Sequence, residues 1–296
     1  TNIQRVIITG RNGFIGSFLI ERLIKQGIQD IVVLDRDIAS KTKVRSITCN
    51  VFSEVDTLKI EIRSGDIVIH LACSSTPASL SEDIEKNNGE LATSLLEVCF
   101  EKKIRKFIFA SSGGTVYGEG IDHDHKESCV LDPKNPYAKV KIAMEQQIQR
   151  SGIPFVILRI ANPYGRKSLT NEKLGAVDVF LQRTMQAKSI EIWGDGSLVR
   201  DYIHIDDVVS FFLKVIEDES INGIYNIGSG VGTSLVELVA IIERVINTKA
   251  NVQFLPVRNV DVSRNVLNNE KARKTGWGPV YNISTGIRSL YEKLVI

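Results

Sequence analysis

The chain lacks the features that mark several large classes of protein. No run of apolar residues approaches the roughly 18 that a membrane-spanning helix needs. The four cysteines (Cys49, Cys73, Cys99, Cys129) stand far apart without a CxxC pair, so we expect free thiols of a cytoplasmic protein rather than a disulfide framework or a zinc site. The net charge of +2 indicates neither a nucleic-acid-binding surface nor an acidic tail.

Repeats, low-complexity tracts and long linkers are also missing. The first residues lead directly into an apolar segment, so we expect no signal peptide. What the sequence does have is 296 residues, of which 43% are apolar and 24% are charged. That length suits one large domain or two smaller ones with a sizeable core.

The N-terminal segment has the pattern of a dinucleotide-binding unit. Residues 6–9 (VIIT) are apolar and β-branched, as in a strand buried on both faces of a parallel sheet. Three glycines (Gly10, Gly13, Gly16) follow, and an amphipathic segment comes after them. This order of strand, glycine turn and helix predicts a site where backbone N–H groups bind a pyrophosphate.

An acidic residue follows the second predicted strand, residues 30–34. Asp35 stands at the distance from the glycines at which a carboxylate binds the ribose hydroxyls of an adenosine. It would repel a 2′-phosphate and so favours NAD over NADP, although the neighbouring Arg36 weakens this preference. The alternative is an ordinary polar residue at the end of a strand.

Strands and helices then alternate along the first half of the chain. Further apolar strands are predicted at residues 66–72, 106–110 and 155–158, and a small polar loop, residues 111–118, follows the second of these. Such alternation predicts an α/β fold with a doubly wound parallel (Rossmann) sheet, whose ligand crevice lies at the carboxyl ends of the strands. The alternation loosens after residue 165, so we expect residues 1–165 to form the NAD-binding Rossmann domain, with later segments returning to it, and residues 166–296 to form mainly a smaller, mixed α/β substrate lobe.

Two histidines in a polar stretch, His123 and His125, suggest a metal site. The neighbouring residues are mostly charged, and the sequence places no third ligand beside the pair. We therefore expect a solvated loop and no metal.

A tyrosine and a lysine lie four residues apart at Tyr137 and Lys141. Pro136 suits the first turn of a helix, and on a helix this spacing puts both side chains on one face. A free tyrosine titrates near pKa ~10, so work as a base near neutral pH needs roughly 4 kcal/mol from nearby positive charge. Lys141 supplies one charge and a bound nicotinamide could supply another, whereas the plain alternative is a solvated helix face.

The second half of the chain offers polar residues in irregular segments. Ser234 and Glu237 predict a helix that starts with a capping box. The arginines there are isolated rather than arranged in a basic stripe, which suits bidentate binding of a diphosphate better than binding along a nucleic acid.

Taken together, these motifs resemble the extended short-chain dehydrogenase/reductase family, in its NAD-dependent nucleotide-sugar epimerase/dehydratase branch. Within that branch the chain is most similar to UDP-sugar 4-epimerases of the bacterial polysaccharide type. The matching segments occur in the family's order and cover nearly the whole chain: TGRNGFIG, Asp35, HLA, SSGGTVYG, YAKVK, RIANPYG, GDGSLVRDY, YNIG and the pair Arg258 and Asp261.

The resemblance implies a role for each matching residue. Tyr137 would be the base, and Lys141 would bind the nicotinamide ribose and lower the pKa of the tyrosine. The residues implied in NAD binding are Gly10, Gly13, Phe14, Ile15, Gly16, Asp35, Arg36, Asn50, Val51, Leu71, Ala72, Asn88, Ser111, Tyr137 and Lys141. The residues implied in holding the nucleotide diphosphate of the substrate are Asn162, Arg200, Arg258 and Asp261.

One position departs from the family's pattern. Gly113 stands where the family usually has a serine or threonine, four residues before Tyr117, so the hydroxyl that steadies the sugar's O4 is missing there. Ser112 and Thr115 are the nearest catalytic substitutes, and we expect Thr115 to lie on the same strand face as the lost hydroxyl.

The resemblance implies a reversible oxidation at the sugar's C4. Tyr137 would take the proton of the 4-hydroxyl while hydride passes to NAD, and the transient 4-keto sugar would rotate before the hydride returns. It also implies a UDP-sugar substrate, a homodimer, and no membrane or nucleic-acid partner. Two alternatives remain: a nucleotide-4-keto-sugar reductase or 4,6-dehydratase of the same family, and an NAD-binding regulator without catalysis.

Overall fold

The computed structural model describes residues 5–37, 44–73, 93–120, 122–166, 175–257 and 262–295. Its internal contacts divide the chain into two units, each assembled from three separate segments. The first unit comprises Thr1–Val116, Pro133–Arg159 and Val209–Tyr225, and the second comprises Tyr117–Asp132, Ile160–Val208 and Asn226–Ile296. The chain therefore passes from one unit to the other several times. The expectation that residues 1–165 bind NAD and residues 166–296 mainly bind the substrate stays a prediction.

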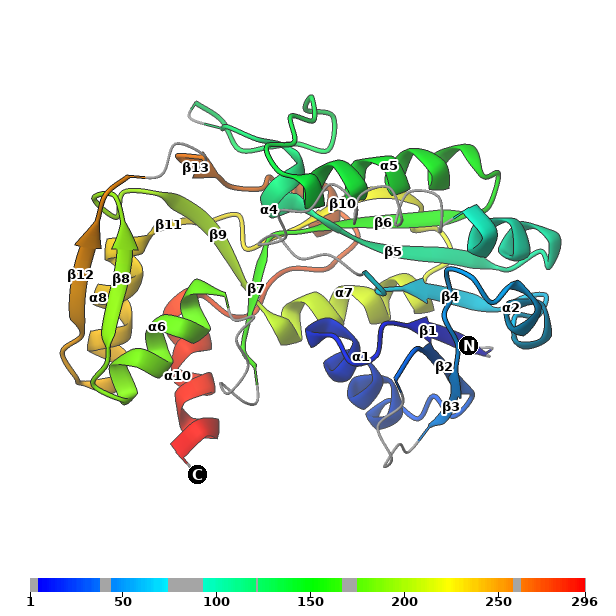
Figure 1. Cartoon of the computed structure of the whole chain (residues 1–296), viewed down its shortest axis with the longest axis horizontal. Helices are drawn as coiled ribbons and strands as arrows, with labels where there is room; N and C mark the ends of the chain where they lie inside the picture. Colours follow the sequence, from blue (N-terminus) through cyan, green and yellow to red (C-terminus); the bar gives the residue numbers. More distant parts are fainter. Residues whose placement is uncertain are drawn as a thin grey trace. The chain divides into compact units, whose positions relative to one another are not determined.

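The first unit is built on a seven-stranded sheet with the order β10-β6-β5-β4-β1-β2-β3 (Figure 1). The strands are β1 (Val6–Thr9), β2 (Ile31–Asp35), β3 (Arg45–Thr48), β4 (Ile67–His70), β5 (Lys106–Ser112), β6 (Phe155–Ile160) and β10 (Gly223–Ile227). The pairs β1–β2, β1–β4, β2–β3 and β4–β5 are parallel. This order, with its reversal at β1, is that of the doubly wound Rossmann fold, as the sequence predicted.

Burial explains why these segments form the inner strands. Every residue of β1 and β4 is buried, which fits the expectation that apolar, β-branched runs lie in a parallel sheet covered on both faces. The helices of this unit include α1 (Phe14–Lys25), α2 (Val55–Glu61), α4 (Gly113–Val116), α5 (Pro136–Arg150), most of α7 (Ile205–Glu217) and the helical segment 93–101. One apolar cluster joins side chains of β4, β5 and β6 with Val140, Met144 and Ile148 of α5.

The second unit has smaller sheets and its own core. Its strands are β7 (Asn162–Tyr164), β8 (Ser189–Trp193), β9 (Val199–His204), β11 (Gly232–Ser234), β12 (Asn251–Leu255) and β13 (Arg264–Asn265), and its helices are α6 (Ala176–Met185), α8 (Leu235–Ile246), α9 (Glu270–Arg273) and α10 (Ile283–Val295). β9 pairs with β11, β13 and β7, while β8 and β12 form a separate parallel pair, visible side by side in Figure 1. A second apolar cluster joins α6, α8 and α10.

Local signals placed several helix starts correctly. Asn135 caps α5 by accepting the N–H of Ala138 at 2.8 Å, and Pro136 occupies the first turn. Ser234 and Glu237 form the predicted capping box of α8. The segment after β5 was predicted as a loop, but Gly113–Val116 forms the helical turn α4 instead. Among the described residues, no helix is long and apolar enough to span a membrane.

Candidate functional site

The glycine turn between β1 and α1 has the geometry that the sequence predicted. Gly10 has φ +77°, and a Cβ there would lie 2.4 Å from the backbone nitrogen of Ala72. A Cβ on Gly16 would lie 2.6 Å from the Gly10 carbonyl oxygen. α1 begins after Gly13, whose lack of a side chain leaves the first N–H groups of the helix without a side-chain cap. The turn thus offers backbone donors to an anion and leaves no room for side chains at Gly10 and Gly16.

Asp35 lies at the end of β2 and contacts this turn directly. Its carboxylate accepts the N–H of Asn12 at 3.3 Å and that of Arg36 at 2.9 Å. Each oxygen of the carboxylate thus has one donor, which fixes the group in place beside the glycine turn, as ribose recognition requires. Asn12, which the sequence analysis did not single out, also donates its side-chain amide to the carbonyl of Asp37. Its position inside the glycine turn was the signal that could have identified it.

A cavity lies over the glycine turn in the first unit. Its lining residues are Gly10, Asn12, Gly13, Leu34, Asp35, Arg36, Asp37, Cys49, Asn50, Val51, Phe52, Leu71, Ala72 and Cys73. Eight residues predicted to bind the cofactor belong to this set: Gly10, Gly13, Asp35, Arg36, Asn50, Val51, Leu71 and Ala72. Asn50 is held in place there by donating its N–H to Glu54 at 3.0 Å and accepting that of Phe52 at 3.2 Å.

Among the described residues, the others predicted for the cofactor are absent from that lining. Phe14, Ile15 and Gly16 form the first turn of α1, and Asn88 lies outside the described residues. Ser111 is buried, and its hydroxyl donates to Glu145, which also receives a bidentate bond from Arg159. The structure therefore gives Ser111 a protein partner behind the site, and no described contact directs its hydroxyl to the cavity.

Tyr137 and Lys141 lie on successive turns of α5. The ammonium Nζ of Lys141 lies 5.6 Å from the centre of the Tyr137 ring and 4.7 Å from that of Phe109. It donates to the carbonyl of Ala110 at 2.9 Å, and the lysine is only 3% exposed. A buried, fixed ammonium beside a phenol is the arrangement that the spacing predicted, and it excludes a fully solvated helix face at Lys141.

Burial and the charge of Lys141 have opposite effects on the pKa of Tyr137, and the effect of burial is larger. Burial raises the pKa of Tyr137 above its ordinary value, and the thiol of Cys73 adds to the increase. The charge of Lys141 and a hydrogen bond with Ser112 lower the pKa, but by less than burial raises it. Lys141 thus acts in the expected direction, and the phenol needs further positive charge before it can work as a base near neutral pH.

The hydroxyls beside Tyr137 are arranged differently from the sequence-based expectation. Thr115 was expected on the strand face of Gly113, but both residues lie in the helical turn α4, because β5 ends at Ser112. Two residues apart on a helix point in different directions, so that reasoning from strand alternation was wrong. Ser112 is the residue that hydrogen-bonds Tyr137, and Thr115 donates its own hydroxyl to Ser112 at 2.9 Å.

The second unit contains a separate cavity of about 300 Å³, at the lower end of the range for ligand sites. It is lined by Asn162, Pro163, Tyr164, Gly175, Ala176, Val177, Phe180, Glu191, Trp193, Leu198, Arg200, Tyr202 and Leu235. Two predicted substrate residues, Asn162 and Arg200, are therefore brought together, whereas Arg258 and Asp261 lie outside the described residues. Trp193 and Glu191 were missed, since nothing in their local sequence distinguished them from ordinary residues of an irregular lobe.

Asp201 holds the wall of this second cavity in place. It is fully buried, and its carboxylate accepts N–H groups from Ser229 at 2.8 Å, Gly230 at 3.1 Å and Leu267 at 3.3 Å. Its carbonyl accepts the side-chain amide of Asn162 at 2.8 Å. The aspartate beside Arg200 is thus a structural residue that fixes β9 and orients the asparagine.

The loop with His123 and His125 was expected to be solvated, and that is only partly correct. His123 is exposed, but His125 is 1% exposed, because its ring stacks on Tyr117 with 4.8 Å between ring centres. The expectation of no metal rested on the lack of a third ligand, and this premise was wrong, because Cys129 lies beside the two histidines.

Comparison with known proteins agrees with the fold and with the glycine turn. Residues 6–228 match the model of the NAD dependent epimerase/dehydratase family. The UDP-glucose 4-epimerase of Mycolicibacterium smegmatis is 29% identical, with 98% of each chain covered. The dTDP-4-dehydro-6-deoxyglucose reductase of Escherichia coli is 30% identical, with 98% of this chain and 97% of that protein covered.

A solved structure is similar over nearly the same length. The UDP-glucose 4-epimerase of Thermus thermophilus, determined in complex with NAD, superposes with a TM-score of 0.88 at 29% identity, covering 99% of both chains. The fold, the glycine turn with its acidic partner, the tyrosine–lysine pair and these similarities lead to one conclusion: the chain belongs to the NAD dependent epimerase/dehydratase family.

Proposed function

We propose that the protein is an NAD-dependent nucleotide-sugar 4-epimerase that acts on a UDP-sugar through a transient 4-keto intermediate. The observation that carries the proposal is the group formed by Tyr137, Ser112 and Lys141, with a phenol hydrogen-bonded to a hydroxyl and next to a buried ammonium. The similarity to UDP-glucose 4-epimerases over nearly the whole chain supports the choice of reaction.

The residues of the first unit fit NAD. The space that a Cβ at Gly10 or Gly16 would fill is the close approach that a pyrophosphate needs, and the uncapped start of α1 provides donors for it. Asp35 presents a carboxylate where the two ribose hydroxyls can donate, and a 2′-phosphate would meet that negative charge. Asn50 and Val51, which also line the cavity, would contact the adenine.

Tyr137 and its neighbours would move the proton. When bound, NAD supplies the acceptor and donor of the hydride at the sugar's C4. Tyr137 removes the proton of the 4-hydroxyl and later returns it, which requires a pKa brought down toward neutrality by Lys141 and by the positive charge of the oxidised nicotinamide. Ser112, already hydrogen-bonded to Tyr137, would take over the hydroxyl function that Gly113 lacks, with Thr115 fixing its orientation.

Residues of the second unit would hold the nucleotide. Asn162, Arg200, Arg258 and Asp261 are the proposed ligands of the diphosphate and its ribose, and the cavity of Asn162 and Arg200 adds the aromatic Trp193, which can stack on a base. The 4-keto sugar, tethered only by its nucleotide, would rotate without leaving the enzyme. The hydride then returns to its opposite face.

A reductase of the same family is the second candidate. The relative from Escherichia coli, at 30% identity, bears that activity, so similarity alone does not separate the two reactions. Asp35 favours NAD, which a 4-epimerase regenerates in each turnover, over the NADPH that a reductase commonly consumes. The 4,6-dehydratase is less favoured, since Gly114 and Thr115 stand where dehydratases of this family usually carry an Asp-Glu pair.

Inversion at C4 tests the proposal directly. The protein is incubated with UDP-, GDP- and dTDP-sugars, and the C4 configuration of the sugar is followed by NMR. We expect inversion of a UDP-sugar without net consumption of cofactor, loss of activity by a factor of about 100 or more in Tyr137→Phe, and a smaller loss in Ser112→Ala than in Tyr137→Phe. Thr115→Val removes only the hydroxyl that orients Ser112, so it should reduce activity less than Ser112→Ala does. Equal rates for Tyr137→Phe and the wild type would contradict the mechanism, and stoichiometric cofactor use would indicate the reductase.

We also propose a cytoplasmic homodimer that supplies precursors for surface polysaccharides. Four cysteines without a disulfide suit a reducing compartment. Phe100, on the helical segment 93–101, is 60% exposed and provides an apolar surface residue that a second copy could cover. Analytical ultracentrifugation of the wild type and of Phe100→Asp tests the dimer, which we expect the substitution to weaken.

A further inference from the structure

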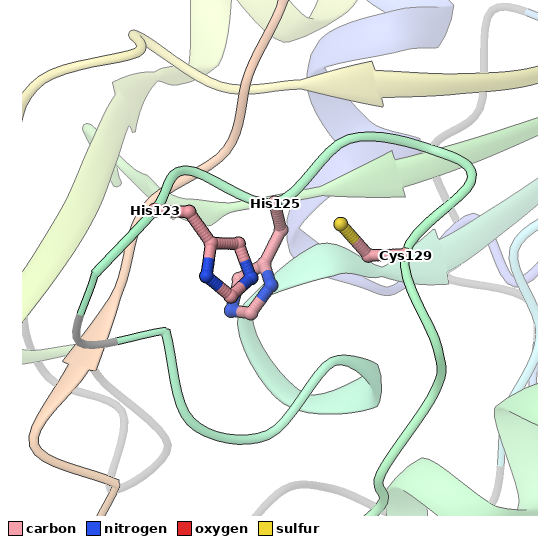
Figure 2. Close-up of side chains that lie close together, drawn as sticks. All are labelled: His123, His125 and Cys129. Carbon is pink, nitrogen blue, oxygen red and sulfur yellow. The ribbon is translucent and has the colours of Figure 1, made fainter.

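The loop formed by residues 122–132 brings three metal-binding side chains together. Figure 2 shows the imidazoles of His123 and His125 beside each other, with Cys129 next to them. The ligand atoms, one from each residue, all lie within 4.8 Å of one another, and the two imidazole rings are 5.1 Å apart, edge to face. The three residues belong to one continuous segment of the second unit, so their grouping depends on this loop alone.

His125 lacks the partners that a buried imidazole normally has. The residue is 1% exposed, and neither of its ring nitrogens has a hydrogen-bond partner of adequate geometry. A buried polar group without a partner costs roughly 1–3 kcal/mol, so its presence needs an explanation. Burial and the neighbouring His123 lower the pKa of His125, and the carbonyl of Gly118 only partly offsets them.

The surrounding chain fixes His125 in place. Its N–H donates to Val266 at 2.9 Å, and its carbonyl accepts N–H groups from Asn268 at 2.8 Å and from the Asn226 side chain at 2.7 Å. A Cβ on Gly120 would lie 2.6 Å from Nε2, so only a glycine lets the chain pass this close to the imidazole. A ligand that the protein holds rigidly is what a metal site needs.

Cys129 is the third side chain of this group, and charged residues lie beside it. The Sγ of Cys129 accepts the backbone N–H of Lys126 at 3.3 Å, which fixes the position of the sulfur. The cation Arg264 lies close, donating to the carbonyls of Gly120 at 2.9 Å and His123 at 2.8 Å, but it pairs with Asp124. The charge of this arginine is thus matched by a carboxylate, and Cys129 would bind a metal ion by giving up its thiol proton.

We propose that His123, His125 and Cys129 form a Zn²⁺ site. Two imidazoles and a thiolate are typical zinc ligands, whereas Ca²⁺ and Mg²⁺ prefer oxygen. In a tetrahedral zinc site the ligand atoms are about 3.5 Å apart, so the group must close by about 1 Å. The exposed His123 and the half-exposed Cys129 can rotate to do so while His125 stays fixed. Three protein ligands leave the fourth position to water, and the ion joins the two ends of the loop.

Metal binding is measured on the purified protein without an affinity tag, after dialysis against chelator under reducing conditions. Zn²⁺ is titrated against a chromophoric chelator, and Co²⁺ is added separately to look for the ultraviolet band of a thiolate–cobalt bond. We expect one Zn²⁺ per chain, and a loss of affinity by a factor of about 10 or more in both His123→Asn and Cys129→Ser. Cys73→Ser, which changes a cysteine outside the loop, should leave zinc affinity unchanged.

Two results would overturn the proposal: the same zinc affinity in Cys129→Ser as in the wild type, or a cobalt spectrum without the thiolate band. Circular dichroism of His123→Asn, whose side chain is exposed, checks that the variant is folded, and a folded variant with unchanged zinc affinity counts against the site. Because the readout is metal binding, the result does not depend on whether the protein epimerises a nucleotide sugar.

Discussion

Gly10→Ala and Gly27→Ala would strain the backbone by similar amounts, but only Gly10→Ala would also cause a steric collision. Gly10 and Gly27 have nearly the same backbone conformation, with φ +77° and φ +79°. A Cβ on Gly27 meets no atom within 4 Å, whereas one on Gly10 lies 2.4 Å from the nitrogen of Ala72 and 2.6 Å from the carbonyl carbon of Leu71. Gly27→Ala therefore measures the conformational cost alone, and Gly10→Ala adds a collision with backbone.

The structure sets the size of each effect. An L-residue in the left-handed region costs about 1–2 kcal/mol, which is all that Gly27→Ala should lose. Ordinary contacts begin at 3.4 Å, so Gly10→Ala must move the chain after β4 by about 1 Å. Overpacking of this kind costs typically about 1–3 kcal/mol, so the total for Gly10→Ala is about 2–5 kcal/mol. The same movement displaces Leu71 and Ala72, which line the proposed NAD cavity.

Urea unfolding and NAD titration measure the two consequences separately. We expect Gly10→Ala to be less stable than Gly27→Ala and to bind NAD about 10-fold or more weakly than the wild type, while Gly27→Ala keeps the wild-type affinity. If the two variants lost equal stability and both kept the affinity for NAD, the close approach at Gly10 would not matter, and the assignment of the cavity would be refuted.

Three further predictions concern charged and titratable groups. Glu145→Gln leaves Arg159 without its buried carboxylate and should lower the free energy of unfolding by about 3–5 kcal/mol in urea, whereas Glu21→Gln, in an exposed pair with Lys25, should change it by less than about 0.5 kcal/mol. Burial lowers the pKa of His70 to about 3, whereas in the unfolded chain the imidazole has its ordinary pKa of ~6.5. As the pH falls below ~6.5, the unfolded chain is protonated while the folded chain is not, so the protein loses stability. The expected loss in the free energy of unfolding is about 2 kcal/mol between pH ~7 and ~5. In His70→Asn the free energy of unfolding should vary with pH by that much less, and an unchanged pH dependence would show that His70 does not cause it. Lys141→Met removes the charge that lowers the pKa of Tyr137, so the rise of the pH–rate profile with pH should move to higher pH, and an unmoved profile would contradict the role of the ammonium.

The parts of the fold that the sequence predicted are those set by local chemistry. Runs such as residues 6–9 form few structures other than a buried strand. Pro136 marks the start of α5 through its fixed φ. The glycine turn was predictable because only glycine tolerates the approach of backbone seen at Gly10.

The features that the sequence analysis missed depend on the path of irregular segments and on the packing of distant ones. Strand alternation placed Thr115 with Gly113, but β5 ends at Ser112, and the start of a helical turn there cannot be read from a small polar segment. Cys129 reaches the two histidines through an irregular loop, where no periodicity relates sequence distance to position. Trp193 lines the second cavity because of the packing of the second unit, and nothing in its immediate sequence shows that.

The first unit cannot complete its sheet during synthesis until β10, which lies far along the chain, has been made. β10 is the outer neighbour of β6, yet β6 ends at Ile160 and β10 begins only at Gly223. Lys106 likewise obtains acceptors at the carbonyls of Asp218, at 3.0 Å, and Ile221, at 2.9 Å. While the ribosome makes residues 161–222, β6 is an open edge and the buried ammonium has no acceptors from that segment. A fragment cut at residue 165 would retain this open edge permanently, which makes it prone to aggregate however complete its cofactor residues are.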